Sequence, residues 1–447
     1  MDLLHGKVRS VYFHYLTAAF GSALISSIYG LVDTAMVGQY QGPEGTAALA
    51  VVAPIWNIIY SLGLLTGIGG SILFGTSRGG EESRGSENQF FTAALLETAG
   101  LALVCWAAIL LFEEPMLRLF GANEALLPLA KEYLLPIKFV VPLFMFNQML
   151  SAFLRNDGAP ALATIAVLAG GIFNVFGDYF FVFTLDYGIM GAGLATAIGA
   201  GISFLILLSH FFSKGNTLRL TGVTELAGKL RQITVSGFSS FFIDVAMGLL
   251  TMMFNRQIML LAGPDALSVY GIIVNISTIV QCCAYSVGQA AQPVISISYG
   301  AGQFDRIREV LRYALCSAGF FALVWTGLIL LFPNTFVYIF MAPTAEVLHI
   351  APAIMRCYGL SFLLLPVNIF STYYFQSIMR PGISFGVAVS RGLVISGVLI
   401  HLLPALFGPT ALWLSMPVTE LMVAIGVAVL ILRCTRALTR QEADSAA

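Results

Sequence analysis

The chain has 447 residues, of which 58% are hydrophobic and only 10% are charged, and its formal net charge is −1. Soluble domains carry about 25% charged residues, so this composition, with a mean hydropathy of +0.88, indicates a polytopic membrane protein. The net charge gives no reason to expect nucleic acid as a partner.

Twelve apolar segments are long enough to cross a bilayer as helices, which takes about 20 residues each. The first segment runs past signal-peptide length without a small-residue cleavage pattern, so we expect it to be retained. We therefore predict an all-α polytopic membrane protein with twelve transmembrane helices. The segments lie at roughly 14–37, 47–76, 90–112, 126–154, 160–184, 189–213, 228–262, 266–299, 311–333, 347–378, 383–404 and 411–433.

Lys and Arg are distributed unevenly between the two sets of connections. Counted together with the adjoining span ends, which carry Lys229, Arg231, Arg312 and Arg433, the N-terminus, the even-numbered connections and the C-terminal tail hold sixteen, including Arg84, whereas the odd-numbered connections hold one, Arg118. Cytoplasmic loops are enriched in these residues. The distribution therefore predicts a multi-pass protein of the inner (plasma) membrane with both termini in the cytoplasm.

The chain also contains an internal repeat. The stretch "GIGGSILFGTSRGG", Gly67–Gly80, matches "GQAAQPVISISYGA", Gly288–Ala301, at an offset of 221, and "FLRNDG" meets "SIMRPG" at an offset of 224. Such repeats indicate two six-helix halves of the same orientation, related by a pseudo-two-fold axis along the membrane normal. The predicted parts are an N-terminal lobe at 1–213, a cytoplasmic connector at 214–227, a C-terminal lobe at 228–437 and a cytoplasmic tail at 438–447.

Two polar residues interrupt the apolar segment "GGIFNVFGDYFFVF", namely Asn174 and Asp178. Their spacing of four places them on one face of a helix, with Gly170 one turn earlier. A charged side chain at bilayer depth costs about 2.5 to 3.5 kcal/mol on insertion scales, so it usually faces a partner or a cavity. A second acid in the same half, Asp33, suggests that the two carboxylates share a cation or a proton. A structural hydrogen bond for Asp178 and an interfacial position for Asp33 are the alternatives.

Four stretches of the N-terminal half, "DTAMVGQ", "LAVVAPI", "FLRNDG" and "GGIFNVFGD", together resemble the MATE family of multidrug and toxic compound extrusion transporters. This family, part of the MOP flippase superfamily, has the same doubled six-span plan, and the resemblance to its prokaryotic members covers essentially the whole chain. It implies a cation or proton site at Asp33, Asn174, Asp178, Thr196 and Tyr133. Thr196 and Tyr133 are assigned by their placement more than by a motif. The alternatives are that Thr196 packs between helices and that Tyr133 lies at the membrane interface.

The second half lacks this site. At an offset of 221, Asn174 falls on Ile395 and Asp178 on Leu399, so the ion site is predicted to be asymmetric. Asp244 lies where some relatives, which resemble the NorM type, have an acid that helps to bind cation or drug. Those relatives also have an acid on the tenth span, which this chain lacks. Asp244 is therefore a candidate substrate site or second proton site.

Three further charged residues lie within apolar segments of the second half: Arg356, Arg391 and Glu420. Arg391 is a candidate partner for Asp244 or Glu420, and such a pairing would make these charges structural. The sequence leaves the roles of all four residues open.

The chain has no Walker A sequence, no GxSxG elbow and no HExxH motif, so we expect no enzyme activity and an ion gradient as the energy source. Its cysteines show no metal-binding spacing, and we expect no disulfide. No cofactor and no metal is expected beyond a candidate sodium ion at Asp33, Asn174 and Asp178.

These features lead to one main hypothesis and two rivals. The main one is a secondary active multidrug antiporter, functional as a monomer in the lipid bilayer, which exports amphipathic or cationic organic compounds by alternating access in exchange for Na⁺ or H⁺. A lipid-linked oligosaccharide or lipid flippase of the same superfold is the first rival, and a receptor or scaffold that transports nothing is the second. The coupling ion, the conformational state, the oligomeric state and the physiological substrate stay open.

Overall fold

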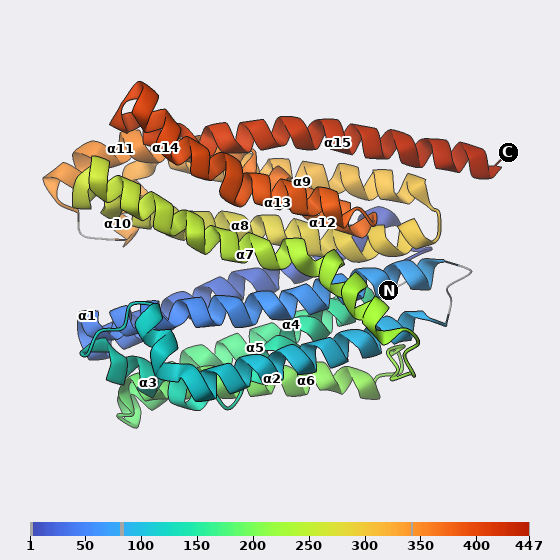
Figure 1. The fold of residues 1–447 in the computed structure, drawn as a ribbon, viewed down its shortest axis with the longest axis horizontal. Coiled ribbons are helices and arrows are strands. Elements are labelled where there is room, and N and C mark those ends of the chain that lie inside the picture. The colour runs from blue at the N-terminus through green and yellow to red at the C-terminus, as the bar shows by residue number, and fades with distance from the viewer. Residues whose placement is uncertain (1–2, 81–84, 341–342, 447) are drawn as a thin grey trace. The chain divides into compact units, whose positions relative to one another are not determined.

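The computed structural model describes residues 3–80, 85–340 and 343–446, and every secondary-structure element within them is a helix (Figure 1). Arg84, part of the charge distribution above, lies outside these residues. The α-helices are α1 (Val8–Gly79), α2 (Glu87–Leu119), α3 (Leu126–Ile137), α4 (Val141–Asn156), α5 (Pro160–Asp178), α6 (Gly188–Leu208), α7 (Leu226–Leu261), α8 (Gly263–Gly300), α9 (Phe304–Leu331), α10 (Pro333–Phe340), α11 (Ala345–Gly359), α12 (Leu365–Ser377), α13 (Pro381–Val389), α14 (Ile395–Phe407) and α15 (Ser415–Ala446). Two π-helical segments, η1 (Tyr179–Thr184) and η4 (Ser390–Val394), and three 3₁₀ segments, η2 (Ser209–Phe212), η3 (Leu360–Leu363) and η5 (Pro409–Leu414), continue some of them.

The described residues contain eleven helices long and apolar enough to span a membrane, and a bent pair of helices provides a twelfth span. Six spans precede the connector and six follow it, so the predicted all-α fold with twelve spans is confirmed. The first two spans both belong to α1, which is interrupted at Gly42, where φ is 70°. Glycine adopts such a φ without a steric penalty, so the break between the two spans falls at this residue.

The fourth span differs from its prediction as one helix at 126–154. It consists of α3 and α4, which meet at an angle of 57°. Pro136 lies in the last turn of α3, and Pro142 lies at the start of α4. Because proline lacks a backbone donor and its ring clashes with the preceding turn, two prolines six residues apart favour a break of the helix between them. A count of apolar residues does not detect this bend.

The surface of the helices is apolar over much of its area. Leu103, Phe176 and Leu205 are 58%, 72% and 68% exposed, and none of them lies at a chain end. Large apolar side chains exposed in this way on helices of membrane-spanning length are solvated by lipid tails rather than by water. This surface agrees with the hydropathy of the chain.

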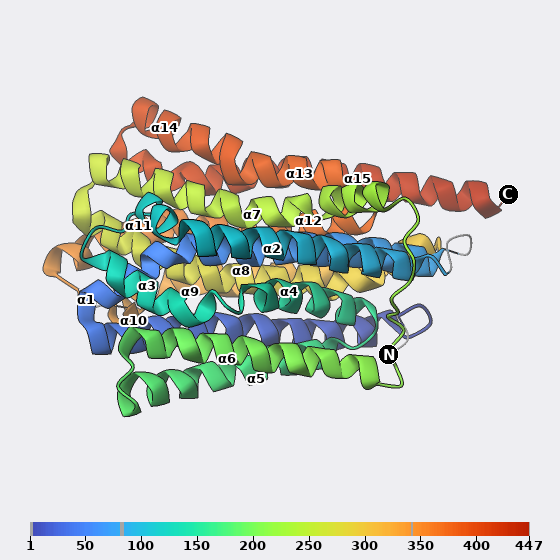
Figure 2. The same ribbon diagram turned by 60° about the horizontal axis from the view of Figure 1, so that its bottom comes forward.

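Contacts within the chain define two compact units. The N-terminal unit comprises Thr17–Phe241 with the residues up to Gly6, and the C-terminal unit comprises the residues from Phe242 onward with Lys7–Leu16. Within the N-terminal unit, α5 runs alongside α6, and α2 packs against α4 (Figures 1 and 2). Within the C-terminal unit, α8 packs against α9, α11 and α12. The lobe boundaries and the symmetry axis deduced from the sequence stay predictions.

The C-terminal helix is longer than the sequence suggested. Helix α15 continues through the predicted tail to Ala446, without a break at residue 437. The segment after Cys434 lacks Gly and Pro and contains good helix formers such as Ala, Leu, Arg and Gln. The apolar pattern marks where the span ends, whereas these residues let the helix extend beyond it.

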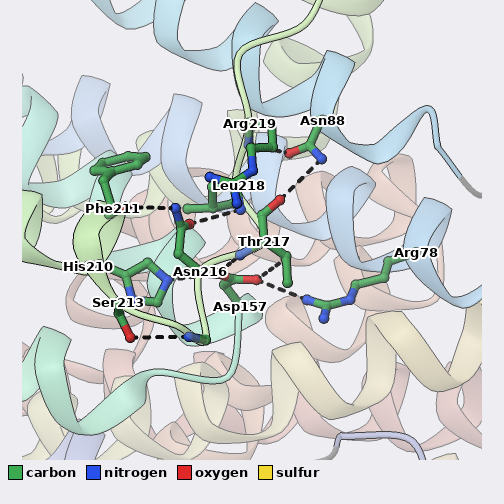
Figure 3. A network of polar contacts seen from close by, with 11 residues as sticks. Arg78, Asn88, Asp157, His210, Phe211, Ser213, Asn216, Thr217, Leu218 and Arg219 are labelled. Carbon is green, nitrogen blue, oxygen red and sulfur yellow. Dashed lines mark hydrogen bonds and ion pairs between the residues drawn. The ribbon is translucent and has the colours of Figure 1, made fainter.

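Within the N-terminal unit, Asp157, between α4 and α5, ties the connector to the neighbouring helices (Figure 3). Its Oδ1 lies 3.0 Å from Arg78 Nη1, and its Oδ2 lies 2.7 Å from His210 Nε2. Thr217 of the connector donates to Asp157 from both its backbone N–H and its hydroxyl. Asn88 at the start of α2 holds the same segment, donating to the carbonyl of Thr217 and accepting from the N–H of Arg219. We call Arg78, Asp157, His210 and Thr217 the connector clasp.

The charge state of Asp157 follows from its surroundings. Burial raises the pKa of this carboxyl group, but the hydrogen bonds from His210 and Thr217 and the charge of Arg78 outweigh burial and hold the pKa below its ordinary value. A side chain that is fully buried therefore stays ionised, because each oxygen has donors.

Candidate cation site in the N-terminal unit

The close packing of α5 and α6 positions the polar side chains of the fifth span. A Cβ atom built on Gly170 would lie 2.1 Å from Ser203 Oγ and 2.6 Å from the carbonyl oxygen of Gly199, so only glycine allows this approach. The position beside Gly170 is thus occupied by the neighbouring helix α6. One turn further along the two helices, Asn174 Nδ2 donates to Thr196 Oγ1 at 3.0 Å.

Asn174 and Asp178 lie on the same face of α5, as their spacing predicts. The amide Nδ2 of Asn174 is 3.5 Å from Asp178 Oδ1, which is a long hydrogen bond. Asp178 is fully buried and Asn174 is 3% exposed. The π-helical segment η1 begins directly after Asp178, and such segments occur frequently at functional sites.

Asp33 comes to the site from the first span. Its Oδ2 accepts a hydrogen bond of 2.8 Å from the hydroxyl of Tyr133, which lies on α3, the first part of the bent span. Both residues are buried. Asp33 lies near enough to Asp178 for negative charges on the two carboxylates to repel each other. The structure therefore brings together all five residues proposed for the cation site, from four spans of one unit.

The oxygen atoms of this cluster have fewer donors than they need. Among the described residues, no group donates a hydrogen bond to Asp33 Oδ1, Asn174 Oδ1 or Asp178 Oδ2, although all three atoms are buried. Each buried acceptor left in this state costs about 1 to 3 kcal/mol, and more when it is charged. Two carboxylates and an amide oxygen with free lone pairs fit a hard monovalent cation, or a proton on either acid.

The charged residues of the C-terminal unit form two other arrangements. Asp244 on α7 accepts a hydrogen bond of 3.3 Å from the hydroxyl of Tyr285. Arg391 in η4 forms an ion pair of 2.8 Å with Glu420 on α15, so of its two candidate partners the structure shows Glu420. The exposed Arg356 donates from Nε to the carbonyl of Leu330 at 3.0 Å.

Two sets of residues escaped the sequence interpretation. Asn368 donates from Nδ2 to Glu420 Oε2 at 2.6 Å, and its position in the apolar stretch "LPVNIF" was the available signal. The connector clasp also went unnoticed, although Asp157 stands in the stretch "FLRNDG" used for the repeat. No spacing along the sequence indicates that Asp157 meets residues of the connector.

Comparison with known proteins yields a consistent set of similarities. The MatE family model matches residues 18–180 and again 236–400. The multidrug export protein MepA of Staphylococcus aureus strain NCTC 8325 is 23% identical over 423 residues, covering 94% of this chain and 92% of its own length. MepA of Staphylococcus saprophyticus is 23% identical over 437 residues, covering 96% and 95%.

Solved structures show a similar fold. An outward-facing multidrug resistance MATE family transporter of the MOP superfamily superposes with a TM-score of 0.90 at 21% identity, over 98% of both chains. A MOP superfamily transporter from Pyrococcus furiosus, described as having a binding pocket of reverse polarity, superposes with a TM-score of 0.89 at 20% identity, again over 98% of both.

Proposed function

The chain belongs to the MatE family, and we propose that it is a secondary active multidrug efflux transporter that exports amphipathic or cationic organic compounds in exchange for sodium ions or protons. The names of the MepA relatives support multidrug export. The main support for coupling of export to an ion is the buried oxygen cluster of Asp33, Asn174 and Asp178. Three acceptor atoms of this cluster lack donors among the described residues.

The cluster can exchange one cation for another. Bound sodium would satisfy the oxygens of Asp33, Asn174 and Asp178 together, and a proton on one carboxyl would turn an acceptor into a donor. Because these residues lie on α1 and α5, a change of occupant alters the attraction between two spans. A site that binds the cation differently in two conformations converts the ion gradient into a change of conformation.

The rest of the proposal follows from the charge distribution and the composition. The protein would lie in the plasma membrane, with both termini in the cytoplasm. Methionine and aromatic side chains supply adaptable surfaces for varied substrates. The rival lipid-linked oligosaccharide flippase would favour a cationic cavity, whereas the buried unpaired oxygens of the N-terminal unit belong to acids and an amide.

Dye efflux from proteoliposomes tests the proposal, with ethidium inside and sodium or proton gradients imposed separately. The parent protein is expected to export ethidium with at least one of the two gradients, and Asp178→Asn is expected to lose this dependence. Asp186→Asn is the matched control, because Asp186 is an exposed acid of the same region that lies outside the cluster. Export by Asp178→Asn equal to that of the parent would refute the coupling role.

A further inference from the structure

A cavity of about 50 Å³ lies within the C-terminal unit, lined by residues of α7, α8, α11 and η4 among others. Four polar residues of the lining are buried: Tyr270, Ser277, Gln281 and Tyr358. The charged residue of the lining, Arg391, is half-buried. Pockets for drug-sized ligands measure about 300 to 1,000 Å³. This cavity therefore has room for one polar group of a substrate and not for a whole drug.

Arg391 lines the cavity, and its guanidinium is held in a fixed orientation. Glu420 binds it through Nε at 2.8 Å, and Asn368 in turn holds Glu420 by donating to Oε2 at 2.6 Å and to the backbone carbonyl at 2.9 Å. Glu420 is fully buried. A guanidinium has five N–H donors, so this ion pair uses one and leaves the four on the Nη atoms for a ligand.

The backbone around Arg391 is also unusual. The residue lies in the π-helical segment η4, between α13 and α14 of the eleventh span. A π-helical turn is rare, occurs frequently at functional sites, and rotates the side chains that follow it relative to a regular helix. The fold thus departs from regular geometry at the residue that carries the positive charge of the cavity.

We propose that this cavity binds the carboxylate of zwitterionic amphipathic substrates, with Arg391 as the anchoring residue. Arginine binds carboxylates through paired N–H donors, and Tyr358, whose hydroxyl accepts from Tyr270 and Ser277, adds a further donor. Met247 and Val274 are half-buried and line the same cavity, so the apolar part of the substrate can lie against them. The inference rests on the proposed function and assigns the place at which a substrate that carries an acid is held.

Rhodamine B, which has a free carboxylate, and its ethyl ester form a matched pair of probes. Fluorescence anisotropy with the purified full-length protein in nanodiscs gives a Kd for each dye, and the ratio of the two values measures recognition of the carboxylate. In Arg391→Gln, the Kd of rhodamine B is expected to rise about tenfold or more relative to the Kd of its ethyl ester, because a charged hydrogen bond is lost. Arg391→Lys keeps the positive charge but loses the paired N–H donors of the guanidinium. It is expected to keep part of the preference for rhodamine B over the ester.

Two further variants and one control distinguish loss of the site from a folding defect. Arg391→Gln combined with Glu420→Gln removes both charges together, so no unpaired buried charge remains, and it is also expected to lose the preference for rhodamine B. Glu420→Gln alone removes the competing carboxylate and is expected to increase that preference. Arg356→Gln, an arginine outside the cavity, is the control and is expected to leave the ratio unchanged.

The outcomes separate this inference from the proposed function. A ratio that stays constant in Arg391→Gln, in Glu420→Gln and in the double variant would overturn the carboxylate site, since a purely structural ion pair changes the binding of both dyes equally. Failure of the parent protein to move either dye in proteoliposomes under any gradient would instead refute the efflux function. A Kd ratio that depends on Arg391 would then still establish the binding site.

Discussion

The hydroxyl of Tyr133 donates a hydrogen bond of 2.8 Å to Oδ2 of Asp33, a residue 100 positions earlier in the chain. The contact joins the first span to α3, the first half of the bent fourth span. It leaves Oδ1 of Asp33 buried and without a donor among the described residues. Asp33 is thus held in place by one oxygen while the other stays available to a cation.

Tyr133→Phe removes this hydrogen bond and keeps the ring. A donated hydrogen bond favours the charged carboxylate, and its loss costs about 1.5 to 3 kcal/mol for a charged acceptor. If sodium drives efflux, the sodium concentration for half-maximal rate is expected to rise about tenfold, because a proton that Asp33 holds more tightly competes with sodium. If protons drive it, half-maximal efflux is expected to move to higher pH, because Asp33 then holds its proton more tightly.

Ethidium efflux measured across a series of sodium concentrations and pH values distinguishes these cases. Tyr187→Phe is a suitable control, because Tyr187 is an exposed tyrosine after η1. Unchanged sodium and pH dependence in Tyr133→Phe would show that the hydrogen bond to Asp33 does not contribute to ion binding.

Much of this fold was accessible from the sequence, because lipid imposes a strong constraint on it. A span needs about 20 apolar residues, and the order of such segments gave the number and approximate bounds of the helices. The spacing of Asn174 and Asp178 also placed both side chains on one helix face. Asp33 was identifiable as an acid within an apolar segment, since such residues are rarely tolerated without a partner.

Other features depend on positions that only tertiary structure sets. The bend between α3 and α4 arises from two prolines within an otherwise apolar segment, which hydropathy scores as continuous. Tyr133 was assigned to the site by resemblance, because a tyrosine near a span end is most often interfacial. Asn368 and Asp157 contact residues 52 and 60 positions away, Glu420 and Thr217, and no local pattern encodes such contacts.

Thr196 is expected to act as the acceptor that orients the Asn174 amide. Thr196→Val keeps the shape of the side chain and removes the acceptor of the 3.0 Å hydrogen bond from Asn174 Nδ2. The freed amide can then rotate and turn its oxygen away from the cluster. We expect ion-driven ethidium efflux to fall about tenfold, in line with a loss of about 1 to 2 kcal/mol for one hydrogen bond. Thr196→Ser keeps the hydroxyl and is expected to retain most of the rate, so equal losses in the two variants would contradict this role.

Asp157 is expected to make stability depend on pH at the connector clasp. Its folded-state pKa lies below the ordinary value, so its contribution is present above the unfolded-state pKa of about 3.9 and is lost as pH falls through the folded-state value. Asp157→Asn is expected to lower the free energy of unfolding by about 1 to 3 kcal/mol at neutral pH, because His210 and Arg78 lose a charged partner.

Thermal unfolding of the purified protein between pH 3 and pH 7.5 measures this effect. The difference in melting temperature between the parent and Asp157→Asn is expected to be constant above about pH 5 and to shrink below about pH 4. Asp305→Asn is the control, because the Asp305 side chain is 82% exposed and its ion pair with Arg308 is a surface contact. A difference between parent and Asp157→Asn that grows as the pH falls would have the wrong sign for this mechanism.

The close approach of α5 and α6 is expected to be necessary for the geometry of the cation site. Gly170→Ala places a methyl group against Ser203 Oγ and the Gly199 carbonyl, at 2.1 and 2.6 Å, and the carbonyl belongs to backbone that cannot rotate away. The helices must separate, which lengthens the hydrogen bond from Asn174 to Thr196 one turn away. Overpacking of this kind costs about 1 to 3 kcal/mol. We expect a lower melting temperature together with weakened ion-driven efflux.

Gly201→Ala, where a Cβ atom has no neighbour within 4 Å, is expected to change neither quantity. A Gly170→Ala protein that keeps the parent's efflux and melting temperature would show that this contact does not position the site.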